Sequence, residues 1–122
     1  MNQPRSTDIG SSPFGLRRED VGDVAVLVVE GEVDLVTAPT LETQLDSMPP
    51  GTSLVVDLCE LTFMDSSGLH VLLDATNRLK GRVHIACVPS GSVGRLFELV
   101  LGTDEALKVF ETRTQAVAAF SS

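Results

Sequence analysis

A short polar segment, 65–68 with the sequence DSSG, holds the side chains best suited to chemistry in this 122-residue chain. It lies between an apolar run that predicts a buried strand, 54–58, and an amphipathic run that predicts a helix, 67–80. Hydroxyl groups are therefore expected at the start of a helix, where free backbone N–H groups and the helix dipole favour negative charge. Ser66 is accordingly a candidate acceptor for a phosphate group.

A catalytic role for Ser66 is a weaker interpretation. A nucleophilic serine needs a base within hydrogen-bond reach and a third group that orients this base. The chain lacks a G-x-S-x-G motif, and its two histidines are His70, one helical turn beyond Ser66, and His84, within an expected strand. Helix capping by Asp65 or Ser66 explains the segment equally well in structural terms, and it is compatible with a phosphorylation site.

A second candidate segment is Gly31–Asp34 (GEVD), at the carboxyl end of another expected strand. In open α/β sheets, the loops at the carboxyl edge gather into one functional surface. We therefore expect Asp34 to share a surface with Ser66. The alternative is that Asp34 belongs to a solvated turn before a helix.

The elements that position these residues alternate between strands and helices. Strands are expected at 14–19, 24–30, 54–58, 83–88 and 107–110, and helices at 38–48, 67–80, 93–100 and 113–120. Thr37 is expected to cap the first helix. The order β-β-α-β-α-β-α-β-α predicts an α/β fold with a mostly parallel sheet of four to five strands and about four helices.

Length and composition limit the classes of protein. We expect a flexible N-terminal tail over 1–13 and a single domain over 14–122. The formal net charge of −8 and the lack of Trp and Tyr argue against a nucleic-acid partner. No apolar run approaches the length of a membrane span, and residues 1–13 contain no secretory signal, so a cytoplasmic protein is expected.

The two cysteines, Cys59 and Cys87, lie in or beside apolar runs and form no C-x-x-C pair. We expect them to be buried, reduced thiols, and the alternative is a disulfide between them, for which the sequence gives no support. Together with two scattered histidines they make no recognisable metal site.

The segment 61–69 (LTFMDSSGL) resembles bacterial anti-sigma factor antagonists, which are stand-alone domains of the STAS family. The segments GEVD at 31–34, TAP at 37–39 and RLF at 95–97 add to the resemblance, which extends over 24–120. It implies a STAS fold and binding to an anti-sigma factor that is also a serine kinase of the histidine-kinase-like ATPase fold. This binding would release a sigma factor.

The resemblance also implies that the kinase phosphorylates Ser66, directly after the motif's Asp65, and thereby ends binding. A phosphatase of the PP2C class would reverse the step, and the antagonist would have no cofactor of its own. The chain departs from the family at His70, where Gly is frequent, which bears on the choice of kinase.

We therefore predict a non-enzymatic binding protein that phosphorylation of Ser66 switches off. Asp65 is expected to position the loop and the Ser66 hydroxyl. The residues expected to contact the partner follow from the two segments and from the exposed side of the second helix: Asp34, Asp65, Ser67, Gly68, His70 and Asp74.

Two alternatives remain open at this point. A two-component receiver domain has similar length and element order, and Asp57 would be its phosphoacceptor. A receiver needs paired acids and a lysine after its last strand, whereas Glu32 and Asp34 are not adjacent and Lys108 begins that strand. The second alternative is a STAS module of a multiprotein stress-signalling complex.

Overall fold

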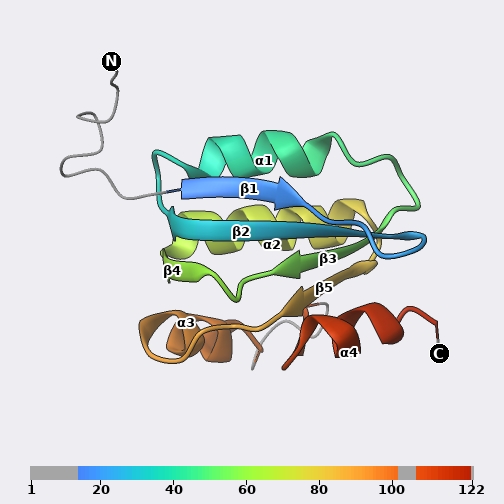
Figure 1. The fold of residues 1–122 in the computed structure, drawn as a ribbon. Coiled ribbons are helices and arrows are strands. Elements are labelled where there is room, and N and C mark those ends of the chain that lie inside the picture. The colour runs from blue at the N-terminus through green and yellow to red at the C-terminus, as the bar shows by residue number, and fades with distance from the viewer. Residues whose placement is uncertain (1–13, 102–106, 122) are drawn as a thin grey trace, which may run out of the picture.

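One sheet of six strands organises the computed structural model, which describes residues 14–101 and 107–121 (Figure 1). The strands are β1 (Phe14–Arg18), β2 (Val24–Val33), β3 (Ser53–Asp57), β4 (Leu61–Met64), β5 (Val83–Ala86) and β6 (Lys108–Phe110). Their order is β1-β2-β3-β5-β6, and β4 pairs with the carboxyl-terminal part of β2. The β1–β2 pair is antiparallel, and the other four pairings are parallel. The expected tail over 1–13 lies outside the described residues.

Four helices accompany the sheet: α1 (Ala38–Asp46), α2 (Ser66–Arg78), α3 (Ser92–Leu101) and α4 (Arg113–Ala118). Helices α1 and α2 pack on one face and α4 on the other (Figure 1). Side chains of β2 alternate between these layers, with Leu27 in the larger core beneath α1 and α2 and Val26 in the smaller core beneath α4. A strand covered on both faces needs apolar residues at every position, which explains the continuous hydrophobic run of β2.

The predicted α/β fold, with a mostly parallel sheet and four helices, is confirmed. The sheet has one strand more than the upper prediction because β4 was missed, and β2 runs to Val33 rather than ending at Glu30. Thr37 is the N-cap residue of α1, as predicted, but its hydroxyl donates to the Glu32 carbonyl (2.9 Å) and makes no capping hydrogen bond to the helix. Within the described ranges, no helix is both long enough and apolar enough to cross a lipid bilayer.

The prediction of two buried, reduced thiols is wrong, since Cys59 and Cys87 form a disulfide in the structure. Strands β3 and β5 are parallel neighbours, with Asp57 opposite Ala86. The residues that follow these two strand ends are therefore adjacent, and the two Cα atoms lie 4.8 Å apart. Cys59 is exposed and Cys87 is half-buried.

Helix α4 docks on the sheet around one buried histidine. The His84 side chain, 4% exposed, stacks on the Phe120 ring with the centroids 3.7 Å apart. Its Nδ1 lies 2.9 Å from the Ala116 carbonyl, and because a carbonyl only accepts, Nδ1 carries the proton. Burial lowers the pKa of His84, and the positive charges of Lys108 and Arg82 lower it further, while the hydrogen bond to Ala116 opposes the shift.

We expect the free energy of unfolding to decrease as the pH falls below 6.5, the ordinary pKa of histidine. The unfolded chain binds this proton at a higher pH than the folded chain does. The stability is therefore lost as the pH falls from the ordinary pKa towards the folded-state pKa. Thermal unfolding from about pH 8 to about pH 5 measures the effect. His84→Phe retains an aromatic ring against Phe120 and should flatten the pH dependence, whereas an unchanged profile would contradict this role of His84.

Candidate functional site

The pairing of β2 with β4 brings two turns to one edge of the sheet. Val33 lies opposite Met64, and the backbone N–H of Asp65 donates to the Val33 carbonyl (3.1 Å). The turn that follows β2, 34–37, and the start of α2 at Ser66 therefore lie on neighbouring strand ends. The structure thus brings Asp34 and Ser66 to the same surface, as the two sequence segments predicted.

Asp65 is the N-cap of α2, and its carboxylate leaves Ser66 unengaged. Its Oδ1 accepts hydrogen bonds from the Ser67 backbone N–H (2.9 Å) and from the Ser67 hydroxyl. Ser66 is exposed, and its hydroxyl makes no hydrogen bond within the described part of the chain. Asp65 was predicted to position the Ser66 hydroxyl. In the structure it binds the Ser67 hydroxyl instead. One of two adjacent serines is bound, and the other is open to solvent.

Asp34 builds the neighbouring turn. Its Oδ1 accepts hydrogen bonds from the backbone N–H groups of Val36 (2.9 Å) and Thr37 (3.1 Å), and its own N–H donates to the Thr37 hydroxyl (2.9 Å). Such Asp-centred turns replace backbone pairing with side-chain hydrogen bonds. The half-buried Asp34 carboxylate thus shapes the turn that carries the next two residues.

Three apolar side chains are exposed on the elements that flank Ser66. Leu35 and Val36 are 78% and 83% exposed, and Phe63 on β4 is 38% exposed. Exposed apolar side chains that gather on one surface commonly mark a protein-binding site. These three residues were not predicted from the sequence, although two bulky apolar residues between the turn-forming Asp34 and Thr37 were a visible signal.

Helix α2 presents a polar face beside these apolar residues. Ser66, His70 and Asp74 are four residues apart, which places them on one side of the helix, and all three are exposed. Gly68 lies on the buried side, where an added Cβ would sit 2.7 Å from Val33 Cγ1 and 2.8 Å from Met64 Cγ. Gly68 therefore allows α2 to approach the sheet closely, and its backbone rather than a side chain shapes the site.

The Asp57 carboxylate, 3% exposed, has both oxygens engaged. Its Oδ1 accepts a hydrogen bond from the Cys59 backbone N–H (2.9 Å), and its Oδ2 accepts one from Arg113 Nε (2.8 Å). Arg113 also pairs with Glu19 (2.9 Å), and hydrogen bonds to Asp57 and Glu19 raise the pKa of Arg113. A phosphoacceptor must be accessible, so this arrangement speaks against the receiver alternative and makes Asp57 a structural residue.

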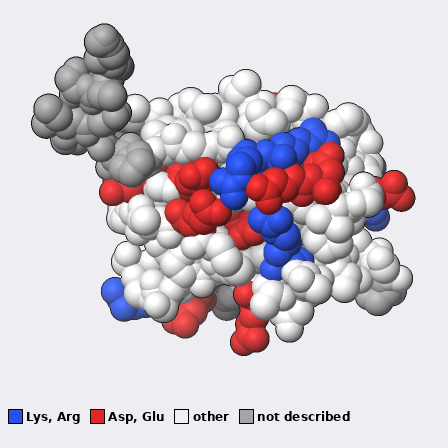
Figure 2. Space-filling model, in the orientation of Figure 1, with Lys and Arg blue, Asp and Glu red and all other residues white. Residues whose placement is uncertain are grey.

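Charged side chains at the centre of the face drawn in Figure 2 form mixed pairs. Arg17 binds Glu30 (2.8 Å), Glu60 (2.9 Å) and also Glu19. Exposed pairs of this kind contribute little stability individually, roughly 0.2–1 kcal/mol. The arrangement neutralises the basic groups of this region and offers no basic track for a polyanion.

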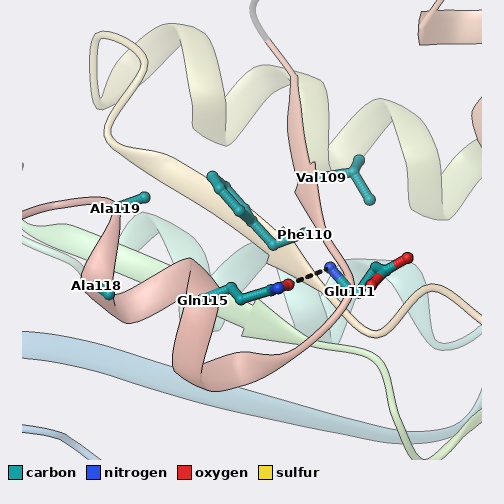
Figure 3. Close-up of a pocket in the computed structure, with 6 residues that line it drawn as sticks. All are labelled: Val109, Phe110, Glu111, Gln115, Ala118 and Ala119. Atoms are coloured by element: carbon teal, nitrogen blue, oxygen red, sulfur yellow. Dashed lines mark hydrogen bonds between the residues drawn. The ribbon is translucent and has the colours of Figure 1, made fainter.

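An open hollow of about 620 Å³ lies between β6 and α4 (Figure 3). Its lining residues are Val109, Phe110, Glu111, Gln115, Ala118 and Ala119. The Gln115 side chain closes one side by accepting a hydrogen bond from the Glu111 backbone N–H (3.2 Å). The same side chain completes the capping box of α4, so these polar groups serve the helix start. We assign no site to this hollow.

The engagement of Asp57 generates a direct test of the receiver alternative. Acetyl phosphate with Mg²⁺ should add no phosphate to the protein, as judged by intact mass. Asp57→Asn should lower the free energy of unfolding by about 1–3 kcal/mol, because it weakens a charged hydrogen bond to Arg113. Asp74→Asn, an exposed control, should leave the stability unchanged. Phosphate gain in the wild type that Asp57→Asn abolishes would restore the receiver interpretation.

Comparison with known proteins places these features in a family context. Residues 16–116 match the family model described as STAS domain. The anti-sigma-F factor antagonist RsfB of Mycobacterium tuberculosis is 34% identical over 100 residues, which cover 80% of this chain and 82% of RsfB.

Solved structures show the same likeness. An anti-sigma factor antagonist from Mycobacterium paratuberculosis superposes with a TM-score of 0.73 at 29% identity, covering 90% of this chain and 96% of that one. The phosphorylated form of SpoIIAA, a Bacillus cell fate determinant, has a TM-score of 0.60 at 19% identity and covers 88% of this chain and 99% of its own. The similarity to SpoIIAA is one of fold.

Proposed function

The chain belongs to the STAS domain family, and we propose that it is an anti-sigma factor antagonist whose binding is switched off by phosphorylation of Ser66. The similarity to the antagonist RsfB, at 34% identity over 80% of this chain, supports the first part of the proposal. The exposed Ser66 hydroxyl, beside a turn that carries two exposed apolar residues, supports the second part.

The charge of a phosphate explains how one group could end binding while the fold persists. A phosphoserine carries about −1.5 to −2 charges at neutral pH. At a helix N-terminus a negative charge is stabilising by roughly 0.3–1 kcal/mol, so phosphorylation of Ser66 should not unfold the domain. The existence of a solved phosphorylated form of SpoIIAA supports the view that this fold accommodates a phosphate.

The same charge is unfavourable inside an interface. The carboxylates of Asp34 and Asp65 lie on the two turns of this surface, so a phosphate there adds to existing negative charge. Burial against a partner would remove the solvent that screens this repulsion. A loss of about 3 kcal/mol corresponds to more than a hundredfold in affinity.

The apolar side chains are the proposed anchors of the partner. Leu35, Val36 and Phe63 expose apolar surface. Burying such surface against a partner makes the free energy of binding more favourable by about 25 cal/mol per Å². His70 and Asp74 extend the polar rim along α2, and Asp34, Asp65 and Ser67 hold the backbone of the two turns. Buried Gly68 contributes by setting the position of the helix.

The remaining parts of the proposal concern the cellular setting. The partner would be an anti-sigma factor with serine kinase activity and a histidine-kinase-like ATPase fold, and its capture would release a sigma factor. A PP2C-type phosphatase would regenerate the unphosphorylated form. The antagonist would act in the cytoplasm as a binding protein without a catalytic step or a cofactor of its own.

To test the phosphorylation site, the protein is incubated with ATP and one candidate kinase at a time. The candidates are the anti-sigma factor kinases of the source organism and the anti-sigma-F factor of Mycobacterium tuberculosis. Wild type should gain one phosphate by mass spectrometry, and Ser66→Ala should gain none. Ser67→Ala is the matched control, since this neighbouring hydroxyl is bound to Asp65, and it should still be phosphorylated. Ser66→Asp should weaken binding about a hundredfold. Equal phosphate on Ser66→Ala, or full affinity of Ser66→Asp, would refute the assignment.

The apolar anchors are tested by Leu35→Ser combined with Val36→Ser. Because both side chains are exposed, the free energy of unfolding should change by less than about 0.5 kcal/mol. Calorimetry should show that the affinity for the anti-sigma factor that binds the wild type falls by about 10- to 100-fold. Val21→Ser, an exposed apolar residue in the turn before β2 and thus at the other end of that strand, should bind normally. Equal loss in Val21→Ser would mean that the interface lies elsewhere.

A further inference from the structure

The disulfide between Cys59 and Cys87 lies near the point at which the strand that pairs with β2 changes from β3 to β4. The pairing of β3 with β2 ends at Asp57, opposite Val28, and the pairing of β4 with β2 begins at Leu61, opposite Gly31. The loop 58–60 carries Cys59 across this change, and the Glu60 carbonyl accepts a hydrogen bond from the Gly31 N–H (3.1 Å). The disulfide therefore fastens the loop from which β4 starts.

The backbone of Cys87 adopts a conformation that side chains disfavour. Its φ angle is +63°, in the left-handed region, where the Cβ of a non-glycine residue crowds the backbone. The Cys87 N–H donates to the Phe110 carbonyl (3.0 Å), and the disulfide supplies the second restraint. Non-glycine residues in this region persist only when their surroundings enforce it, so loss of the disulfide would allow this residue to relax.

The disulfide is also connected to the position of α4. The Cys59 N–H donates to one oxygen of Asp57, and Arg113 of α4 donates to the other. Movement of the loop that contains Cys59 therefore disturbs a buried carboxylate that α4 also uses. The sulfur atoms and an Asp57 oxygen lie within 4.8 Å of one another, so the three groups form one cluster.

We propose that the Cys59–Cys87 pair is a reversible thiol–disulfide switch that sets how firmly β4, and with it the start of α2 at Ser66, is held. Two observations distinguish it from a purely structural crosslink. Cys59 is exposed, so a reductant can reach it, and exposed disulfides are commonly the labile, regulatory ones. Cys87 is held in a disfavoured conformation, so the reduced form has a different preferred backbone.

The proposed reduction uses a dithiol. One thiolate of the dithiol attacks Cys59 Sγ, the bond between the two cysteine sulfurs breaks, and Cys87 leaves as a thiolate that takes a proton from water. The second thiolate of the reductant then attacks the reductant's own sulfur in the mixed disulfide and releases Cys59, which is also protonated. The protein gains two electrons and two protons, and the dithiol becomes a cyclic disulfide. A disulfide oxidant reverses the reaction.

Reduction should leave the fold in place but loosen one region. Most of the larger core comes from β2, β3, β5, α1 and α2, and β4 adds Leu61 and Met64, so most of its packing does not depend on the disulfide. A disulfide that spans 28 residues restrains the unfolded chain, and its loss should lower the thermal midpoint by about 10 °C. The local loosening is expected in the loop 58–60, in β4 and in the residues after Cys87.

The redox step is tested on the full chain without any partner. Under native conditions, millimolar dithiothreitol followed by iodoacetamide should label both cysteines, and without dithiothreitol it should label neither. Hydrogen exchange of the amides 58–64 should accelerate about tenfold on reduction, while the amides of 24–28 change less. Resistance of the disulfide to dithiothreitol in the folded state, or identical exchange in both redox states, would overturn the proposal.

Matched variants distinguish the proposed switch from nonspecific destabilisation of the fold. Cys59→Ser and Cys87→Ser should each resemble the reduced wild type and show no response to dithiothreitol. In a Cys59→Ser background, Cys87→Gly should be more stable than Cys87→Ser, because glycine accepts the left-handed backbone. If Cys87→Gly and Cys87→Ser were equally stable, the strained backbone would not drive the change.

The consequence for binding rests on the proposed function and has its own readout. The rate at which an anti-sigma factor kinase phosphorylates Ser66 should differ at least about threefold between the oxidised and the reduced protein. Equal rates, with exchange that still responds to reduction, would overturn the coupling to Ser66. Because thiol labelling and hydrogen exchange need no kinase, failure of the proposed function would leave those results intact and would be recognised separately.

Discussion

The two halves of the proposed binding surface meet at a backbone hydrogen bond from the N–H of Asp65 to the carbonyl of Val33. It continues the parallel pairing of β4 with β2 by one residue beyond Met64. Without this pairing, the start of α2 and the turn after β2 would be separate loops. With it, the exposed hydroxyl of Ser66 and the exposed side chains of Leu35 and Val36 belong to adjacent strand ends.

The same local hydrogen bond, from a backbone N–H to an aspartate carboxylate, occurs after three strands at this edge of the sheet. Asp34, Asp57 and Asp65 each accept a hydrogen bond from the backbone N–H two residues further along. Each of these hydrogen bonds fixes the backbone after a strand, and Asp57, which has both oxygens engaged, is also an unfavourable phosphoacceptor. The exposed groups beside these turns include the Ser66 hydroxyl, the apolar side chains of Leu35 and Val36, and the polar side chains of His70 and Asp74. A surface built in this way is suited to binding and to modification of one residue.

Part of this arrangement could be predicted from the sequence. Alternating apolar runs and helical periodicity indicated the parallel sheet, and the DSSG segment indicated a helix that starts at about Ser67, one residue after its start in the structure. Strand β4 was missed because it has only four residues, of which Thr62 and Phe63 are exposed. The disulfide depends on which strands are neighbours, and local patterns carry no such information. Leu35 and Val36 were overlooked because apolar residues in a turn belong to no periodic face.

The central claim is that a phosphate on Ser66 changes one surface and leaves the domain unchanged. The most direct test is a comparison of amide ¹H–¹⁵N spectra of the protein before and after stoichiometric phosphorylation. Our account predicts shifts confined to the amides of 34–37 and 63–70, with the signals of β3, β5 and α4 unmoved. Shifts spread through the sheet would contradict it, because they would mean that phosphorylation acts by rearranging the fold.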